Sequence, residues 1–204
     1  MDDSDDKNLT NKYQTSFFDN FINYCKNFKE NKIILVGSDT TNTGKTTIIE
    51  KLMYFLNQQN KKVLYIHTIN QIQEETKDAL INDNLFLNKN MDYTKFNTIN
   101  ENVHKAYLLI NDSNQYDLAD LKSMENFFTS LYKSEYDYIF IETSDTLINP
   151  YFFTSLAGFC SFVCLVCKYK HSHRKNLQEL VSVMQKKDIS NIKGVLNVIH
   201  KKYI

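Results

Sequence analysis

Short apolar runs alternate with longer amphipathic segments along most of this chain, and this alternation restricts the folds that the sequence can adopt. The runs are nearly continuous in apolar residues, as expected of strands that are buried on both faces. Helix-length segments separate them, so neighbouring strands need crossover connections and run parallel. The sequence therefore predicts an α/β fold with three layers, in which helices cover both faces of a doubly wound, mainly parallel sheet.

The expected elements can be assigned by residue range. Strands are predicted at 32–37, 61–67, 105–111, 136–142, 161–169 and 192–199. Helices are predicted at 16–28, 45–60, 117–135, 151–159 and 173–188. The inward stripe of the helix at 45–60 is expected to comprise Ile48, Leu52, Phe55 and Leu56. Residues 68–102 are polar and rich in Asn, with weak helical character at 74–85, and their order is not predicted.

Composition limits the function classes. The 204 residues, 42% of them hydrophobic, suit one globular domain over 1–204, with a flexible polar start at 1–12. Lys+Arg and Asp+Glu balance at 24 each, so overall charge gives no attraction to nucleic acid. The acidic start differs from a signal peptide, and no run approaches about 18 apolar residues. We expect a cytoplasmic protein that binds no nucleic acid and does not itself insert into a membrane.

Three of the four cysteines lie close together. Cys160, Cys164 and Cys167 occur in the apolar run "FCSFVCLVCKY". Zinc sites favour pairs of Cys-x-x-Cys on turns, whereas buried free cysteines behave as small apolar residues. A core role is therefore favoured over a metal site.

The segment "GSDTTNTGKT" follows the first expected strand and opens the helix at 45–60. In the strict Walker A pattern, Gly-x-x-x-x-Gly-Lys-Thr, backbone N–H groups hold phosphates, the lysine reaches them and the threonine binds magnesium. Gly44, Lys45 and Thr46 match this pattern. Its first glycine position holds Asp39, and Gly37 lies two residues earlier. The loop is therefore longer or differently shaped.

Asp39, Asn42 and the flanking threonines can occupy turn conformations, and Asn and Asp are the non-glycine residues that best tolerate positive φ. The alternative is an ordinary strand-to-helix turn with a capping threonine, which does not explain Gly-Lys-Thr-Thr at the helix start. Phosphate binding is favoured. The residues predicted to bind the nucleotide are Gly37, Thr43, Gly44, Lys45, Thr46, Thr47 and Asn197.

The order of segments after this loop is informative. Following "GKTTIIEKL" come "KKVLYIH", "AYLLINDSNQYDLADL", "SEYDYIFIETSDTL" and a final third ending in "GVLNVI". Over roughly Lys32–Ile199 the chain resembles the cytoplasmic ATPase domain of bacterial tyrosine kinases of the exopolysaccharide and capsule assembly family. The resemblance implies a P-loop NTPase fold of the MinD/ParA-like superfamily, with ATP or ADP and Mg²⁺ as ligands.

The resemblance also implies roles for single residues. Lys45 would bind the ATP phosphates, Thr46 and Glu142 would hold the magnesium, and Asn197 would recognise the adenine edge. On position alone, Asn197 fits a strand-end turn equally well. The implied partner is a membrane-embedded polysaccharide co-polymerase or activator, and assembly into a homo-oligomer stays open.

Departures from the family pattern affect the expected chemistry. The family carries Asp-x-Asp-x-Arg after its second strand, and here "HTINQ" begins at His67. Walker B ends in Glu142 instead of aspartate, which moves the carboxylate by about 1 Å. Phosphoryl transfer needs a carboxylate that orients the nucleophile, so weak or lost kinase activity is expected. His67 can in principle accept a proton, although a local hydrogen-bonding role is favoured.

Two further family features are reduced. The N-terminal Glu-x-x-Arg-x-x-Arg motif is absent from "KYQTSFFDNFINYCKN", and the C-terminal tyrosine cluster is reduced to Tyr203. Arg174 is the single arginine of the chain and is expected to be a solvated residue at a helix start.

Four alternatives stay in view. One is an active tyrosine autokinase of the same family, and another is a nucleotide-sensing scaffold without turnover. A dethiobiotin-synthetase-like ligase shares the start of the loop, but it needs a lysine after the second strand and a glycine-rich run after the acidic strand end. A partition or septum-site ATPase would place a signature lysine early in the loop, where "GSDTTNT" has none.

Overall fold

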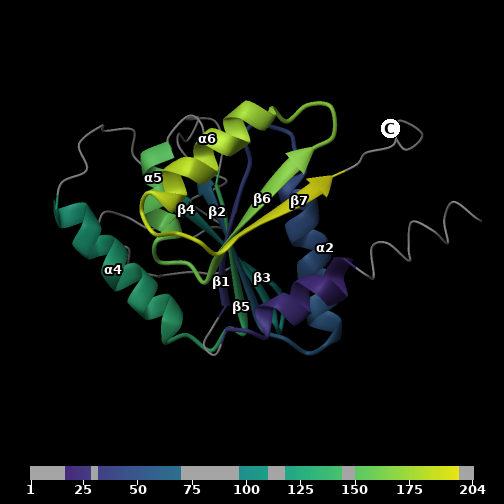
Figure 1. Ribbon diagram of the computed structural model, residues 1–204. Helices are drawn as coiled ribbons and strands as arrows, with labels where there is room; N and C mark the ends of the chain where they lie inside the picture. The colour runs from purple at the N-terminus through teal and green to yellow at the C-terminus, as the bar shows by residue number, and fades with distance from the viewer. Residues whose placement is uncertain (1–16, 29–31, 70–96, 110–117, 144–149, 198–204) are drawn as a thin grey trace, which may run out of the picture.

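Seven strands form one sheet in the computed structural model, which describes residues 17–28, 32–69, 97–109, 118–143 and 150–197 (Figure 1). The sheet order is β3-β4-β2-β5-β1-β6-β7. All neighbouring strands are parallel except β3 and β4, which are antiparallel. The strands are β1 (Lys32–Gly37), β2 (Val63–Ile69), β3 (Asn97–Asn100), β4 (Val103–Leu109), β5 (Tyr138–Glu142), β6 (Phe162–Lys168) and β7 (Ile192–Asn197).

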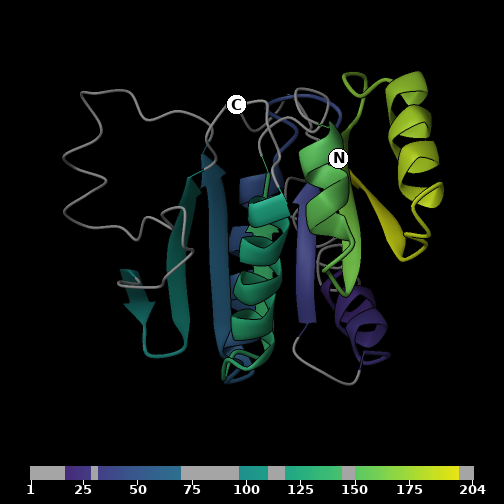
Figure 2. The ribbon, with the colours of Figure 1, turned by 90° about the vertical axis from the view of Figure 1, so that its left-hand side faces the viewer.

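Helices cover both faces of this sheet. They are α2 (Lys45–Gln58), α4 (Leu118–Tyr132), α5 (Pro150–Ala157) and α6 (Arg174–Gln185), together with helical residues 17–25. Figure 2 shows α4 and α5 in front of the sheet and α2 behind it. The predicted three-layer, mainly parallel α/β fold is therefore confirmed.

The continuous apolar runs have a direct structural cause. Alternate residues of a strand face opposite sides of the sheet, and here both sides are packed. Ile33 and Leu35 of β1 join the core beneath α4, α5 and α6. Ile34 and Val36 join a second core beneath α2 and residues 17–25. A strand between two helical layers needs apolar residues at every position, which is the pattern that the sequence shows.

The inward face of α2 differs from the prediction. Leu52 and Leu56 are buried as expected, and Ile49 and Met53 complete the buried face. Ile48 and Phe55 are only half-buried and pack at its side. Phe18 stacks on Phe55 with ring centroids 5.2 Å apart, so a second helix covers the residues that the sheet does not reach.

The other differences in elements are small. The sequence analysis did not predict β3, and β4 begins two residues earlier than expected. The expectations for residues 1–12 and 74–85 lie outside the described residues. None of the described helices combines the length and the apolar character that a membrane span requires.

The cysteines belong to the core. Cys164 is buried within β6, Cys167 lies half-buried near its end, and Cys160 precedes the strand. Burial raises the pKa of the Cys164 thiol to about 12, which keeps it protonated and unreactive. Within the described ranges, no three His, Cys, Asp or Glu residues come together as a metal site.

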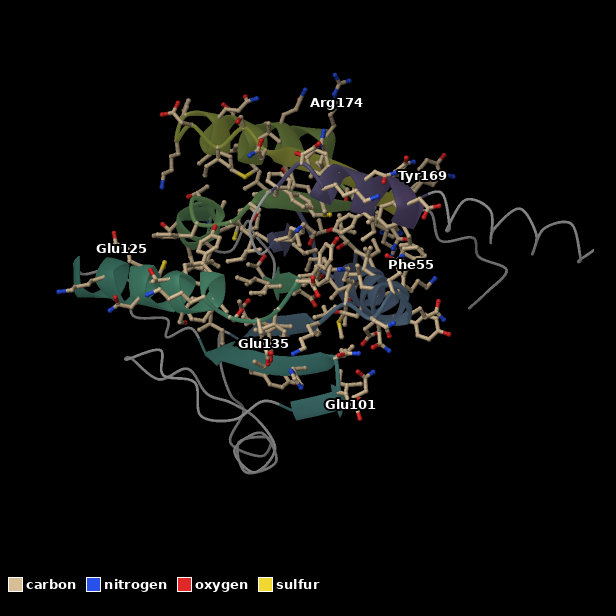
Figure 3. The ribbon with its side chains drawn as sticks, turned by 90° about the horizontal axis from the view of Figure 1, so that it is seen from below. Phe55, Glu101, Glu125, Glu135, Tyr169 and Arg174 are labelled. Atoms are coloured by element: carbon tan, nitrogen blue, oxygen red, sulfur yellow. The ribbon has the colours of Figure 1, made fainter. Side chains whose placement is uncertain are left out.

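The carboxyl ends of the parallel strands meet at one edge of the sheet, where ligands bind in open α/β folds. Arg174 and Tyr169 lie near one lateral edge of the sheet, on the β6–β7 side, and Glu101 lies at the other edge, beside β3 (Figure 3). Arg174 is exposed at the start of α6, as expected. The strand ends that carry the predicted site, those of β1, β2 and β5, are central.

Candidate functional site

The loop between β1 and α2 ends in a left-handed glycine. Gly44 is the N-cap of α2, with φ 91° and ψ 24°. No side chain caps this helix, and its first turn carries no acidic residue. The alternative of an ordinary turn predicted a threonine that caps the helix, and that prediction is wrong. The first N–H groups of α2 carry the positive end of the helix dipole and can receive an anion.

The loop reaches its shape with one non-glycine residue in the left-handed region. Asn42 has φ 53°, as expected for a substitute glycine. Asp39 lies in a bend, as a turn residue should, but its φ is not positive. Its side chain is instead fully buried, and its Oδ2 accepts a hydrogen bond from the backbone N–H of His173 at 2.6 Å. A residue that starts α6 thus holds the loop.

The last strand holds the loop from the other side. The Asn197 Nδ2 amide, at the end of β7, donates to the Thr43 carbonyl oxygen at 2.8 Å. A Cβ added to Gly44 would lie 2.3 Å from that Nδ2 atom. Glycine is therefore favoured at position 44 by its φ, and a Cβ there would displace the Asn197 amide from the loop.

Lys45 directs its ammonium group along the loop. Its side chain is buried, and Nζ donates to Ser38 Oγ at 2.8 Å. Ser38 Oγ in turn donates to the Thr40 carbonyl oxygen at 2.6 Å. This buried ammonium group lies beside the start of α2, where its charge adds to the attraction of the helix start for an anion.

Several buried polar atoms of the loop have no hydrogen-bond partner among the described residues. They are Asp39 Oδ1, Thr40 Oγ1 and Thr43 Oγ1, and Thr68 Oγ1 on β2 is a further case. Buried polar groups are almost always paired in native structures. The two loop hydroxyls can donate, so phosphate oxygens would be suitable partners.

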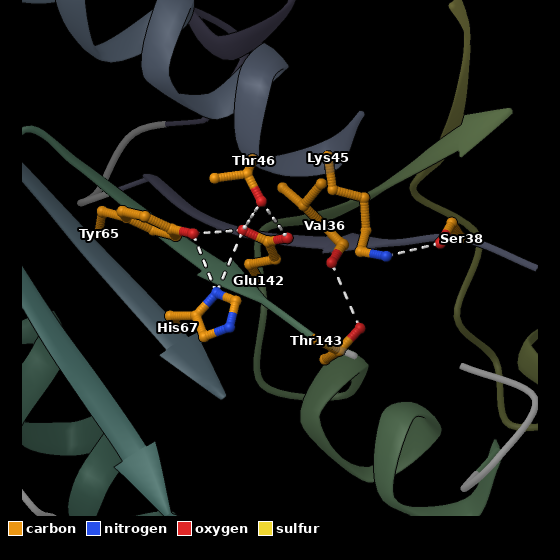
Figure 4. A network of polar contacts seen from close by, with 8 residues as sticks. All are labelled: Val36, Ser38, Lys45, Thr46, Tyr65, His67, Glu142 and Thr143. Atoms are coloured by element: carbon orange, nitrogen blue, oxygen red, sulfur yellow. Dashed lines mark hydrogen bonds and ion pairs between the residues drawn. The ribbon is translucent and has the colours of Figure 1, made fainter. Parts of the chain in front are cut away.

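A second group of polar side chains converges on Glu142, at the end of β5 (Figure 4). The Thr46 hydroxyl donates to Oε1 at 2.8 Å and lies 3.1 Å from Oε2. The Tyr65 hydroxyl donates to Oε2. His67 Nδ1 lies 3.4 Å from Oε2 and 3.0 Å from the Tyr65 hydroxyl. Three elements, α2, β2 and β5, therefore meet at one carboxylate.

The network keeps Glu142 ionised. Burial by itself raises the pKa of this carboxyl, but hydrogen bonds from His67, Tyr65 and Thr46 outweigh burial and lower the pKa below its usual value. Burial, and then the charge of Glu142, raise the pKa of Tyr65. The phenol therefore stays protonated and donates to the carboxylate.

The donor set fits a divalent cation bound together with phosphates. A hydroxyl and an ionised carboxylate are suitable ligands for a hard cation such as Mg²⁺. Thr46 and Glu142 are the residues that would hold it. Because so few protein ligands converge here, phosphate oxygens and water would have to complete the coordination.

The structure gathers most of the predicted site residues. Thr43, Gly44, Lys45 and Thr46 form the helix start, with Glu142, His67 and Asn197 around it. Gly37 ends β1 at the beginning of the loop, and Thr47 lies exposed on α2. Tyr203 lies outside the described residues.

Sequence reasoning missed Tyr65 and Ser38. Tyr65 is two residues before His67 on the same strand, so a period of two places both side chains on the same face. This spacing of two residues was the signal by which Tyr65 could have been found. Ser38 carried no signal, because its role depends on where the Lys45 side chain turns.

No protein-family model matches the chain, and no curated protein matches it. Solved structures do. The kinase domain of the Escherichia coli tyrosine kinase ETK is 16% identical, covers 90% of this chain and 73% of its own, and has a TM-score of 0.64. A plasmid partition protein from Borrelia burgdorferi, bound to AMPPNP, is 22% identical, with coverages of 85% and 78% and a TM-score of 0.61. The Aquifex aeolicus cell division protein MinD is 16% identical, with coverages of 84% and 70% and a TM-score of 0.60.

The chain has the fold of the MinD/ParA-like P-loop NTPases. The kinase domain of VpsO, at 20% identity and a TM-score of 0.64, strengthens the similarity to bacterial tyrosine kinase domains. The resemblance inferred from segment order is thus confirmed at the level of the fold. Identities this low leave the chemistry to be argued from the site itself.

Proposed function

We propose that this chain is an ATP- or ADP-binding domain related to bacterial tyrosine kinases, with weak or lost phosphotransfer. The observation that carries the proposal is the helix start. A left-handed Gly44, a buried Lys45 ammonium and the contact between Thr46 and Glu142 lie together at the amino end of α2. This is the arrangement that a phosphate chain with a divalent cation requires.

Each residue has a distinct task in this proposal. Backbone N–H groups of the helix start and the Lys45 ammonium bind phosphate oxygens, and Thr40 and Thr43 hydroxyls gain the acceptors that they lack. Thr46 and Glu142 hold the cation, which neutralises phosphate charge when bound. Asn197 fixes the loop through Thr43, and its recognition of the adenine edge stays a prediction.

Weak turnover follows from the residue at position 67, two residues before the end of β2. Transfer to a hydroxyl needs a carboxylate that orients the nucleophile, and His67 occupies the position where the resembling family carries the first aspartate. Glu142, the nearby acid, already accepts hydrogen bonds from Thr46 and Tyr65. We infer a regulatory role in the cytoplasm, in capsule or exopolysaccharide synthesis and export, through a membrane-embedded partner that reads the nucleotide state.

Replacing Lys45 with Met tests the site. We expect the affinity for ATP and ADP in the presence of Mg²⁺ to fall by about 10- to 100-fold, because charge-assisted hydrogen bonds to phosphate are lost. Isothermal titration calorimetry measures this directly. Lys51→Met, an exposed position on the same helix, is the matched control and should bind like the wild type. Unchanged affinity in the Lys45 variant would refute the assigned site.

The turnover prediction is tested separately. With γ-labelled ATP, we expect no label on the protein's own tyrosines or on a tyrosine-containing polymer. Phosphate release should also stay near the background of the Lys45→Met variant. Autophosphorylation that disappears in Lys45→Met would favour the active autokinase.

A further inference from the structure

A groove of about 580 Å³ runs between α6 and β7, on the face of the sheet opposite to α2. Leu177 and Val181 of α6 and Leu196 of β7 give it an apolar lining. Leu196 is 61% exposed, although β7 is the last strand of the sheet and its side chains could have been covered by a further element. An exposed leucine between other apolar side chains suits a segment that packs into the groove.

The rim of this groove is basic. Lys168, Lys170 and Arg174 line it, and none of the described residues around it is acidic. Within the described ranges, the ion pairs of the structure involve other residues. Arg174 lies on the β6–β7 side of the sheet, as does Tyr169 (Figure 3). Three cations beside an apolar lining favour a segment that is acidic and also carries an apolar residue.

The turn that carries the rim has a fixed shape. The Lys168 N–H donates to Ser172 Oγ, and the Ser172 N–H donates to the Lys168 carbonyl oxygen, both at 2.9 Å. Lys170 has a left-handed backbone, with φ 63°. The Tyr169 N–H donates to the Asn197 carbonyl oxygen at 3.0 Å, which joins the turn to the end of β7. The backbone that carries the cations is therefore ordered before a segment docks, so docking costs less free energy.

The chain itself contains a segment of the required chemistry. Its first six residues include four aspartates and no basic residue, and Leu9 follows them. Residues 1–16 lie outside the described residues, so the described fold begins at Phe17. The acidic residues and Leu9 match the two properties of the groove, its positive rim and its apolar lining.

The helical residues 17–25 bring this segment close to β7. They pack on the opposite face of the strand, where Lys193 Nζ lies 4.4 Å from the centroid of the Tyr24 ring and Val195 joins the same core. From position 6 to position 17, an extended chain spans roughly 35–40 Å. Packed layers of secondary structure lie about 10 Å apart, so the acidic residues can pass the edge strand and reach the rim.

We propose that the acidic start of this chain docks on the basic rim of its own α6–β7 groove and places Leu9 against the apolar lining. The aspartates concerned are Asp2, Asp3, Asp5 and Asp6. Exposed ion pairs contribute little one by one. A tethered segment, however, has an effective concentration in the millimolar range, so a weak contact forms within one chain before it forms between two. The contact does not rest on the nucleotide function.

The test is carbodiimide cross-linking of the 204-residue chain, followed by mass spectrometry. The reagent joins a carboxylate to a lysine amine where the two groups are in direct contact. We expect links from the four aspartates to Lys168 and Lys170. Links to Lys26 and Lys51 should be rare, because these exposed lysines lie outside the groove.

One variant and one change of solvent probe the role of charge. In Arg174→Gln, links to Lys168 and Lys170 should fall by about two- to fivefold, as expected for the loss of one exposed ion pair. Lys133→Gln, an exposed position after α4, is the matched control and should keep the wild-type yield. In 1 M NaCl the screening length falls to about 3 Å, so wild-type links should decrease as well. The salt experiment does not depend on how a variant folds.

An equal mixture of ¹⁴N- and ¹⁵N-labelled protein identifies the chain that supplies the segment. Links within one chain join two peptides with the same isotope, which is the expected result. Linked peptides with different isotopes would show that a second copy occupies the groove, contrary to the proposal. Links spread evenly over Lys26, Lys51 and the groove lysines would overturn it. Yields that are unchanged in both Arg174→Gln and 1 M NaCl would overturn it too.

Discussion

Among single residues, Gly44 carries the most demanding conformation of the site. Its φ of 91° is strained for any other residue, and a Cβ would lie 2.3 Å from Asn197 Nδ2. We expect Gly44→Ala to lower the free energy of unfolding by about 2 kcal/mol, because a left-handed backbone costs an L-residue about 1–2 kcal/mol and the contact adds to this. ADP affinity should fall as well. Urea denaturation and calorimetry measure the two effects.

Gly194→Ala is the matched control for that substitution. Gly194 lies on β7 with no atom within 4 Å of an added Cβ and with an ordinary φ. Its replacement should change stability by less than about 0.5 kcal/mol. Equal stability of the two variants would show that the loop adapts to a side chain at position 44.

The sequence indicated some site residues and not others for a physical reason. Lys45, Thr46 and Glu142 could be assigned from the local sequence, because Lys45 and Thr46 begin a helix and Glu142 ends a strand. Asp39 was assigned a turn role because local propensity favours it there. Its actual partner, the His173 amide, is 134 residues away and cannot be seen from local sequence.

At the scale of elements, the contact between Asp39 and His173 joins the phosphate loop to α6. The N-cap of α6 is His173, which has no side-chain cap, and the first turn of the helix carries no acidic residue. The Asp39 carboxylate therefore supplies, from another element, the negative charge that a helix start favours. The position of α6 and the shape of the loop depend on each other through this contact.

Substitution of Asp39 tests this link. Asp39→Ala should destabilise the protein by about 1–3 kcal/mol, because the partly buried hydrogen bond from the His173 N–H to the carboxylate is lost. Asp39→Asn keeps an acceptor oxygen and should cost clearly less. Urea unfolding gives the free energies, and hydrogen exchange at the His173 amide should accelerate in Asp39→Ala alone. Similar exchange in all three proteins would rule out the proposed coupling.

The elements themselves were largely predictable. Both faces of the central strands are buried, so their apolar runs are unambiguous, and the bounds of β1 agree with the prediction residue for residue. The four residues of β3, "NTIN", carry no apolar alternation and lie at an edge, so no pattern marked them. The face of α2 was misjudged because a second helix, at 17–25, covers part of it.

At the scale of the whole molecule, burial fixes the fold while a few side chains fix the chemistry. Solved structures that are only 16–22% identical to this chain share its fold. The fold, which the apolar pattern specifies, is therefore retained at low sequence identity. His67, near the end of β2, contacts Glu142 and does not affect the core, so function has to be tested at such side chains.

The hydrogen bond between Asn197 and Thr43 joins residues 154 positions apart. A ribosome adding about 5–20 residues per second needs roughly 8–30 s to pass from one to the other. During that interval the nascent chain displays its Gly-Lys-Thr segment without the contact from β7 that holds it. The loop thus gains this support only after translation has delivered β7, and a polypeptide truncated before β7 would lack it.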